Sequence, residues 1–227
     1  MTKLAKALIF AAATTCFTSV ANAQATPSAA PGTNPYTGPA PTYDFDTPGT
    51  TPTTDPSGCC VVTGTTPNVY AQPYGSSDYY FSSGPSTVEP ATILFGAWAG
   101  SISSLSFIWG SIDSYNSLTF TDAAGNPLGA GYTFTGSDIA LLIPALANGD
   151  QSDPNTNPLV TFNFADPTVV GGMQLTSNGT NAFEIDNIAI NPVPEPATWA
   201  MMLFGFGAVG VAMRRRKAPA GKLAQVA

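Results

Sequence analysis

Between residues 79 and 190, short runs of alternating apolar and polar residues are separated by turn-forming residues. In the clearest run, Leu105, Phe107 and Trp109 share one parity, with mostly serine on the other. Alternation with a period of two residues is typical of β-strands that bury one face. The runs predict strands at residues 104–109, 115–121, 131–135, 159–164, 172–176 and 182–190. Many short strands without a helical repeat favour an all-β fold, an antiparallel β-sandwich or jelly roll.

We expect this sandwich ectodomain to cover residues 76–191, with two departures from regular alternation. The apolar residues change parity between Ile185 and Ile188, which predicts a β-bulge at Asp186-Asn187. Residues 139–146 are compatible with a short helix or a strand, but Pro144 favours an irregular crossing.

The first residues follow the order of a secretory signal peptide. Two lysines precede an apolar run over residues 7–20, and Ala21 and Ala23 then supply small residues before Gln24. This order predicts a signal peptide over residues 1–23 that is cleaved before Gln24. The rest of the chain is therefore expected to leave the cytoplasm.

A second apolar run, residues 197–213, carries no charge and ends at a basic cluster. At ~1.5 Å per residue, a helix over this run spans about 25 Å, near the short end for a bilayer core. We therefore predict a single transmembrane helix in the inner membrane, with residues 218–227 as a cytoplasmic tail. Trp199 suits the outer interface. The prolines on either side of Glu195 keep the preceding chain extended, as the cleft of a processing enzyme requires.

These C-terminal elements resemble the PEP-CTERM sorting signal, in the variant with a Trp-Ala pair, over residues 192–217. The residues that carry the resemblance are Pro194, Glu195, Pro196, Trp199, Ala200, Arg214, Arg215 and Arg216. The resemblance implies recognition by an exosortase, a membrane cysteine-type transpeptidase of Gram-negative bacteria that make exopolysaccharide. It also implies that the Pro-Glu-Pro segment is the recognition element, and that the chain reaches the cell surface or extracellular matrix.

Residues 24–75 are rich in Pro and Thr and poor in large apolar residues, which predicts a linker without a core. A flexible linker and an O-glycosylated stalk both fit this composition. Cys59 and Cys60 lie in this segment, where export would expose them to oxidising conditions. We expect a disulfide between these neighbours, or intermolecular bridges. A catalytic thiolate is disfavoured because no nearby basic residue lowers a cysteine pKa.

Charges are segregated along the chain. All seven basic residues lie within residues 3–6 or 214–222, and all fourteen acidic residues lie between these two groups. A purely anionic body disfavours nucleic acid as a partner. The absence of histidine removes the commonest general base and the usual zinc ligand.

Five residues of the body offer oxygen ligands: Asp113, Asn116, Glu184, Asp186 and Asn187. Glu184 and Asp186 point from the same face of one predicted strand. Because clustered carboxylates repel each other unless a cation neutralises them, a structural calcium site is one hypothesis. Alternatively, the first two residues cap turns and Asp186-Asn187 fixes the bulge, or two carboxylates form the acid/base pair of a hydrolase.

Segments Trp109–Asn116 and Phe183–Asn187 also resemble recurrent motifs of exosortase-dependent surface proteins. That resemblance implies a β-sandwich similar to carbohydrate-binding modules. Trp109 has the parity of the core positions, so the exposed aromatic candidates for stacking on a sugar are Tyr74, Tyr79, Tyr80 and Tyr115. Ice binding is disfavoured because the threonines show no sustained repeat along the sequence.

Together these features predict an exported, membrane-anchored and exosortase-sorted surface or matrix protein, without catalytic activity and associated with exopolysaccharide. The alternative is a carbohydrate-binding module on the same anchor, and a carboxylate-based hydrolase or an ice-binding protein is less favoured. The expected partners are an exosortase-like transpeptidase, exopolysaccharide and the inner membrane. No cofactor is expected apart from the hypothetical calcium ion.

Overall fold

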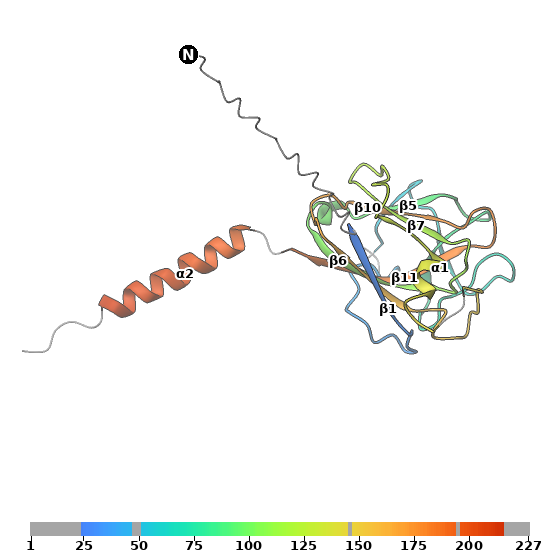
Figure 1. The fold of residues 1–227 in the computed structure, drawn as a ribbon, viewed down its shortest axis with the longest axis horizontal. Helices are drawn as coiled ribbons and strands as arrows, with labels where there is room; N and C mark the ends of the chain where they lie inside the picture. The colour runs from blue at the N-terminus through green and yellow to red at the C-terminus, as the bar shows by residue number, and fades with distance from the viewer. Residues whose placement is uncertain (1–23, 47–50, 145–146, 194–195, 216–227) are drawn as a thin grey trace, which may run out of the picture.

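The computed structural model describes residues 24–46, 51–144, 147–193 and 196–215. Two antiparallel β-sheets pack against each other, and a helix follows them towards the C-terminus (Figure 1). The predicted signal peptide, including Ala21 and Ala23, lies outside the described residues. The predicted antiparallel β-sandwich is confirmed.

One sheet has six strands in the order β1-β9-β6-β11-β4-β3, and the other has five in the order β2-β5-β10-β7-β8. The strands are β1 Ala25–Ala30, β2 Thr53–Asp55, β3 Val61–Thr63, β4 Tyr79–Ser83, β5 Ala91–Leu94, β6 Ile102–Gly110, β7 Ser117–Thr121, β8 Thr133–Thr135, β9 Leu159–Phe164, β10 Gly172–Thr176 and β11 Phe183–Pro192. A 3-10 helix, η1, covers Gly96–Trp98, and two α-helices, α1 and α2, cover Gly136–Ala140 and Pro196–Arg215.

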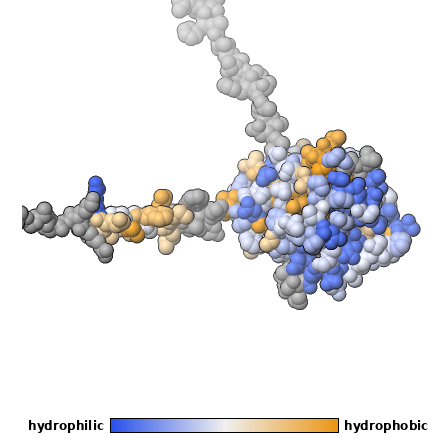
Figure 2. All heavy atoms as spheres, turned by 90° about the horizontal axis from the view of Figure 1, so that it is seen from below, coloured by the Kyte–Doolittle hydropathy of each residue, from blue (hydrophilic) through white to orange (hydrophobic). Residues whose placement is uncertain are grey.

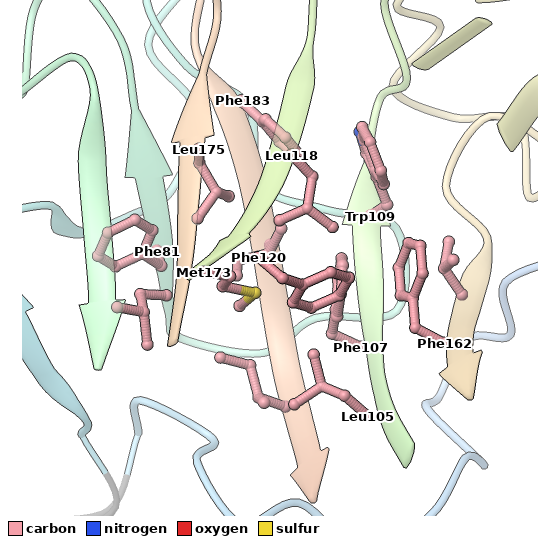
Figure 3. Close-up of a cluster of buried hydrophobic side chains, with 14 of the residues drawn as sticks. Phe81, Leu105, Phe107, Trp109, Leu118, Phe120, Phe162, Met173, Leu175 and Phe183 are labelled. Carbon is pink, nitrogen blue, oxygen red and sulfur yellow. The ribbon is translucent and has the colours of Figure 1, made fainter. Parts of the chain in front are cut away.

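The core lies between the two sheets and is rich in aromatic rings (Figure 3). Trp109 of β6 stacks on Phe183 of β11, with 4.4 Å between their ring centroids. Phe120 of the five-stranded sheet meets Phe162 of the six-stranded sheet edge to face, at 5.0 Å. All four side chains are fully buried. Such aromatic pairs add about 1 kcal/mol each beyond the burial of their area. The Phe120–Phe162 pair therefore holds the two sheets together, whereas the Trp109–Phe183 pair joins two neighbouring strands of one sheet.

The strands predicted from alternation are present at nearly their predicted positions. The bulge is also confirmed, because the register between β11 and β6 shifts between Asp186 and Ala189. At residues 139–146 the prediction of an irregular crossing is only partly right. Thr135 and Asp138 form a capping box that starts α1, and the helix ends at Ala140, followed by turns up to residue 144.

The prediction of a coreless linker over residues 24–75 is wrong. The whole of β1 pairs with β9, while β2 and β3 pair with β5 and β4. Phe45 and Cys60 from this segment are buried in the core. The Pro/Thr-rich composition concealed β1 because it is an edge strand, where Pro27 does not remove a necessary hydrogen bond. The sandwich thus begins at β1, not at residue 76.

Parts of the chain that precedes β4, which we call the covering segment, also lie over the outer side of the six-stranded sheet. Pro73 packs directly on Gly110 of β6, where an added Cβ would lie 2.8 Å from the Pro73 Cγ. Only glycine permits this close approach without a shift of the proline. The segment predicted as a linker therefore packs on the outer side of the six-stranded sheet.

The predicted C-terminal helix is present as α2, with Pro196 at its first position, where proline is favoured. Figure 1 shows α2 apart from the sandwich, and Figure 2 shows its hydrophobic surface beside a mainly hydrophilic body. Leu203 and Phe204 are among its exposed side chains. The sequence predicts a membrane-spanning helix at residues 197–213, whereas among the described residues no helix is both long and apolar enough to cross a membrane.

Candidate functional site

A small polar pocket lies where β11 begins, between β11, the turn after β6 and two covering loops. Residues 66–71, Ser111, Asp113, residues 149–151 and residues 181–184 contribute to its walls. Its volume is about 40 Å³, which suits a few water-sized groups or one small ion. The topology brings together segments that are far apart in the sequence because β11 pairs with the end of β6.

The Glu184 carboxylate forms the floor of this pocket. It is 2% exposed, and Oε1 accepts a hydrogen bond from the Ala71 backbone N–H at 2.8 Å, while Oε2 accepts one from the Ser111 hydroxyl at 3.3 Å. Burial raises the pKa of Glu184 to about 8, although these hydrogen bonds oppose the shift. Residues 24–193 contain no basic side chain that could oppose this shift, so burial favours the neutral form of Glu184.

Asp113 and Asn116 shape the turn on the opposite wall. The Asp113 backbone N–H donates to Asn116 Oδ1 at 2.9 Å, and the Asn116 N–H donates back to the Asp113 carbonyl at 3.1 Å. The Tyr115 hydroxyl donates to Asp113 Oδ2 at 2.5 Å. Burial raises the pKa of Asp113, and the bond from Tyr115 opposes that rise. The sequence-based alternative that these two residues fix a turn is confirmed.

Asp186 and Asn187 form the bulge on β11. Asn187 has a positive φ of 56°, and its backbone N–H donates to Asp186 Oδ1 at 2.7 Å. Beyond the bulge, the Ile188 carbonyl accepts the N–H groups of Thr42 and Tyr43, at 2.7 and 2.9 Å. The bulge therefore turns β11 towards the covering segment, which pairs with it at this point.

The Asp186 carboxylate is enclosed beneath that covering segment. It is 1% exposed, and burial raises its pKa to about 7, with a further contribution from repulsion by Asp46 and Asp44. Asp46 itself accepts hydrogen bonds from the Ser77 hydroxyl at 2.9 Å and the Tyr79 N–H at 2.6 Å. Carboxylates thus gather at both the pocket and the bulge, but each has polar partners.

The five predicted calcium ligands do not converge on one point. Asp113 and Glu184 share the pocket, Asn116 directs its Oδ1 to the Asp113 N–H, and Asp186-Asn187 lies at the bulge. Across the described ranges, no group of three or more Asp, Glu, His or Cys side chains is placed to hold a metal ion. Calcium binding stays a prediction of the sequence.

The aromatic candidates for sugar binding divide into two groups. Trp109 is fully buried, as its parity predicts, but Tyr80 is also fully buried, so its predicted exposure is wrong. Tyr80 lies inside because its hydroxyl donates to the Gly64 carbonyl at 2.5 Å beneath the covering segment. Tyr79 is 47% exposed, and Tyr74 and Tyr115 are half-buried.

Cys59 and Cys60 form the predicted disulfide between neighbouring residues. Cys60 belongs to the hydrophobic core, and Cys59 packs against it. The Cys60 carbonyl accepts the Ser82 N–H of β4 at 2.8 Å. The burial of Cys60 and this hydrogen bond hold the chain before β3 against the sandwich. A thiolate nucleophile is not available at this position while the disulfide persists.

Asn157 is a residue that the sequence did not single out. Its buried Oδ1 accepts the N–H groups of Ser111 at 2.8 Å and Tyr74 at 3.1 Å, and its Nδ2 donates to the Asp150 and Asp153 carbonyls, each at 3.0 Å. One amide thus joins three loops beside the pocket. Its position before Pro158 indicated a turn, but nothing local in the sequence revealed these distant partners.

The sorting-signal residues lie after the last strand. Pro194, Glu195 and Arg216 fall outside the described residues, whereas Pro196, Trp199, Ala200, Arg214 and Arg215 belong to α2. No curated protein and no solved structure matches the chain significantly. Residues 192–217 match the PEP-CTERM protein-sorting motif, as the sequence predicts. The chain therefore carries a C-terminal segment similar to the PEP-CTERM sorting motif.

Proposed function

We propose that this chain is an exported bacterial surface or matrix protein that an exosortase sorts and that associates with exopolysaccharide without catalysing a reaction. The match of residues 192–217 to the sorting motif is the observation that carries the proposal. The motif itself supports sorting to the cell surface. Association with exopolysaccharide and the absence of catalysis go further and are our inference.

The fold supports delivery of the motif to a processing enzyme. β11 ends at Pro192, and α2 begins at Pro196, so the recognition segment falls between the sandwich and the helix. Figure 1 shows that α2 stands away from both sheets. An enzyme can therefore reach this segment without unfolding the sandwich.

The chemistry of the body supports a non-catalytic role. The carboxylates of Glu184 and Asp186 are almost completely buried and bonded to neighbouring groups. Cys59 and Cys60 are consumed in a disulfide, and the sequence contains no histidine. These features disfavour the usual nucleophiles and general bases of hydrolases.

The proposal is tested by replacing Glu195 with Ala in the native host and measuring the intact mass and location of the protein. We expect the wild-type chain to lose residues at both ends and to appear at the cell surface. Glu195→Ala should retain its C-terminal segment and fail to reach the surface, while Asp166→Asn, an exposed change in the body, should behave as wild type. Identical masses and locations for all three proteins would overturn the proposal.

A further inference from the structure

The outer face of the five-stranded sheet presents a continuous set of small polar side chains. Six residues of β7, β8 and β10 form it, and we call them the threonine face: Ser117, Thr119, Thr133, Thr135, Gln174 and Thr176. Their neighbours of opposite parity, such as Leu118 and Met173, are fully buried in the core. The six side chains therefore point away from the core, and each is half-buried or exposed.

The pairing of the strands arranges these side chains in rows. Gln174 lies opposite Thr119, which lies opposite Thr133, and the next row contains Thr176, Ser117 and Thr135. Neighbouring strands are ~4.8 Å apart, and alternate residues along one strand are ~6.8 Å apart. The Thr119 and Thr133 hydroxyls are 3.0 Å from each other. The side chains on this grid form a surface of hydrogen-bonding groups.

The threonine face has no charge, although it belongs to a strongly anionic body. None of its six residues is acidic, whereas acidic residues lie at its borders, with Asp138 accepting the Thr135 hydroxyl at 2.7 Å. No basic side chain occurs between residues 24 and 193. An anionic polymer is therefore repelled by the body, while a neutral polymer can approach this face without burying an unpaired charge.

We propose that the threonine face binds an extended, uncharged polysaccharide through hydrogen bonds between sugar hydroxyls and the side chains of this face. This inference rests on the proposed association with exopolysaccharide and narrows its chemical class to neutral chains. The face has no aromatic residue for ring stacking, so each sugar unit is held weakly. Affinity then comes from several units of one chain that bind successive rows together.

The test is affinity electrophoresis of the full-length chain in gels that contain dextran, amylose, a β-1,3-glucan or alginate. We expect at least one neutral polysaccharide to slow migration and alginate, which is anionic, to leave it unchanged. Replacing Thr119 and Thr133 together with Val keeps the β-branched shape and removes two hydroxyls. This double variant should weaken binding about tenfold, as expected for two lost hydrogen bonds.

Thr26→Val is the matched control, because Thr26 is an exposed threonine of β1 on the other sheet. It should bind as wild type. The proposal is overturned if no neutral polysaccharide binds, if alginate binds as well, or if the double variant is unaffected. Inhibition of ice recrystallisation by wild type but not by the double variant would instead assign the face to ice. Sorting is measured separately from mass and location, so a failure of sorting with intact binding would overturn only the proposed function.

Discussion

Glu184 and Asp186 are acids enclosed in a domain without basic side chains, so burial favours their neutral forms. Their pKa values rise from 4.5 to about 8 and from 3.8 to about 7. A raised pKa in the folded state means that folding binds protons. The stabilisation is complete below about pH 4 and is lost as the pH rises through about 7 to 8. We therefore expect this domain to be more stable in mild acid than in mild alkali.

Glu184→Gln tests this pH dependence. The amide keeps the shape of the side chain and cannot ionise, so the variant should have a higher melting temperature than wild type at pH 9. At pH 5 the two should differ little. Thermal unfolding followed by circular dichroism from pH 4 to 9 measures the effect, and parallel curves for the two proteins would refute it.

Asp122→Asn provides a control in which folding shifts the pKa in the opposite direction. Asp122 lies at the surface, and hydrogen bonds from Asn126 lower its pKa. Its contribution to stability is present above its ordinary pKa and lost as the pH falls through the lowered value. The variant should therefore be less stable than wild type by a constant amount from neutral to alkaline pH, so that it keeps the same alkaline loss of stability, and the difference should disappear in acid.

Asn187 tests the bulge through its backbone. Its φ of 56° lies in the left-handed region, which glycine and asparagine adopt more easily than β-branched residues. Asn187→Val should lower the free energy of unfolding by about 2 kcal/mol, whereas Asn187→Gly should change it by about 0.5 kcal/mol or less. Urea denaturation measures both. Equal losses would show that the asparagine side chain, and not the backbone, is what matters at this position.

At the scale of elements, substitutions in β1 test whether the segment predicted as a linker is an integral part of the sandwich. Ala25 is 1% exposed beside β9, while Ser28 of the same strand is exposed. Ala25→Asp would bury an unpaired carboxylate and should cost about 3 kcal/mol. Ser28→Asp should cost about 0.5 kcal/mol or less. Urea denaturation of both variants distinguishes an integral strand, which requires unequal losses, from a loose linker, which predicts small losses in both.

The strands that the sequence predicts are those in which alternation reflects one buried face. In β6, parity alone correctly places Phe107 and Trp109 in the core. The sequence of β1 shows no such alternation because its side chains are small or proline, and β2 and β3 have only three residues each. The partner of β1, the strand β9, lies far away along the chain. The pairing of distant segments, not local composition, makes them strands.

The same distinction applies to the candidate site. Parity places Glu184 and Asp186 on one face of β11, and the structure agrees, but it does not reveal that this face is covered. Their burial depends partly on residues 24–75, which the sequence presents as a linker. No sequence pattern marks the threonine face either, because its rows run across three strands and produce no repeat along the chain.

For the whole molecule, the concentration of negative charge predicts a response to salt. Repulsion among the acidic residues of the body weakens as ions screen it, over a Debye length of ~30 Å at 0.01 M and ~3 Å at 1 M. Raising sodium chloride from about 0.01 M to about 0.5 M should therefore raise the melting temperature. Scanning calorimetry measures it, and no change or a decrease would contradict the prediction.

Calcium chloride at matched ionic strength separates screening from specific binding. An equal rise in melting temperature with both salts indicates screening alone and counts against the predicted calcium site. A larger rise with calcium, lost in Asp113→Asn, would support that site near the polar pocket.

The direct passage from β11 to the sorting segment has a mechanical consequence. β11 lies between β6 and β4 and continues towards α2. Once the tail is tethered, flowing water that drags on the body pulls β11 along its own length. The hydrogen bonds to β6 run across the direction of pull, so they bear the load in shear together and do not open one after another. If the protein is held at this end, the load therefore falls on a strand with partners on both sides, which resists being pulled out.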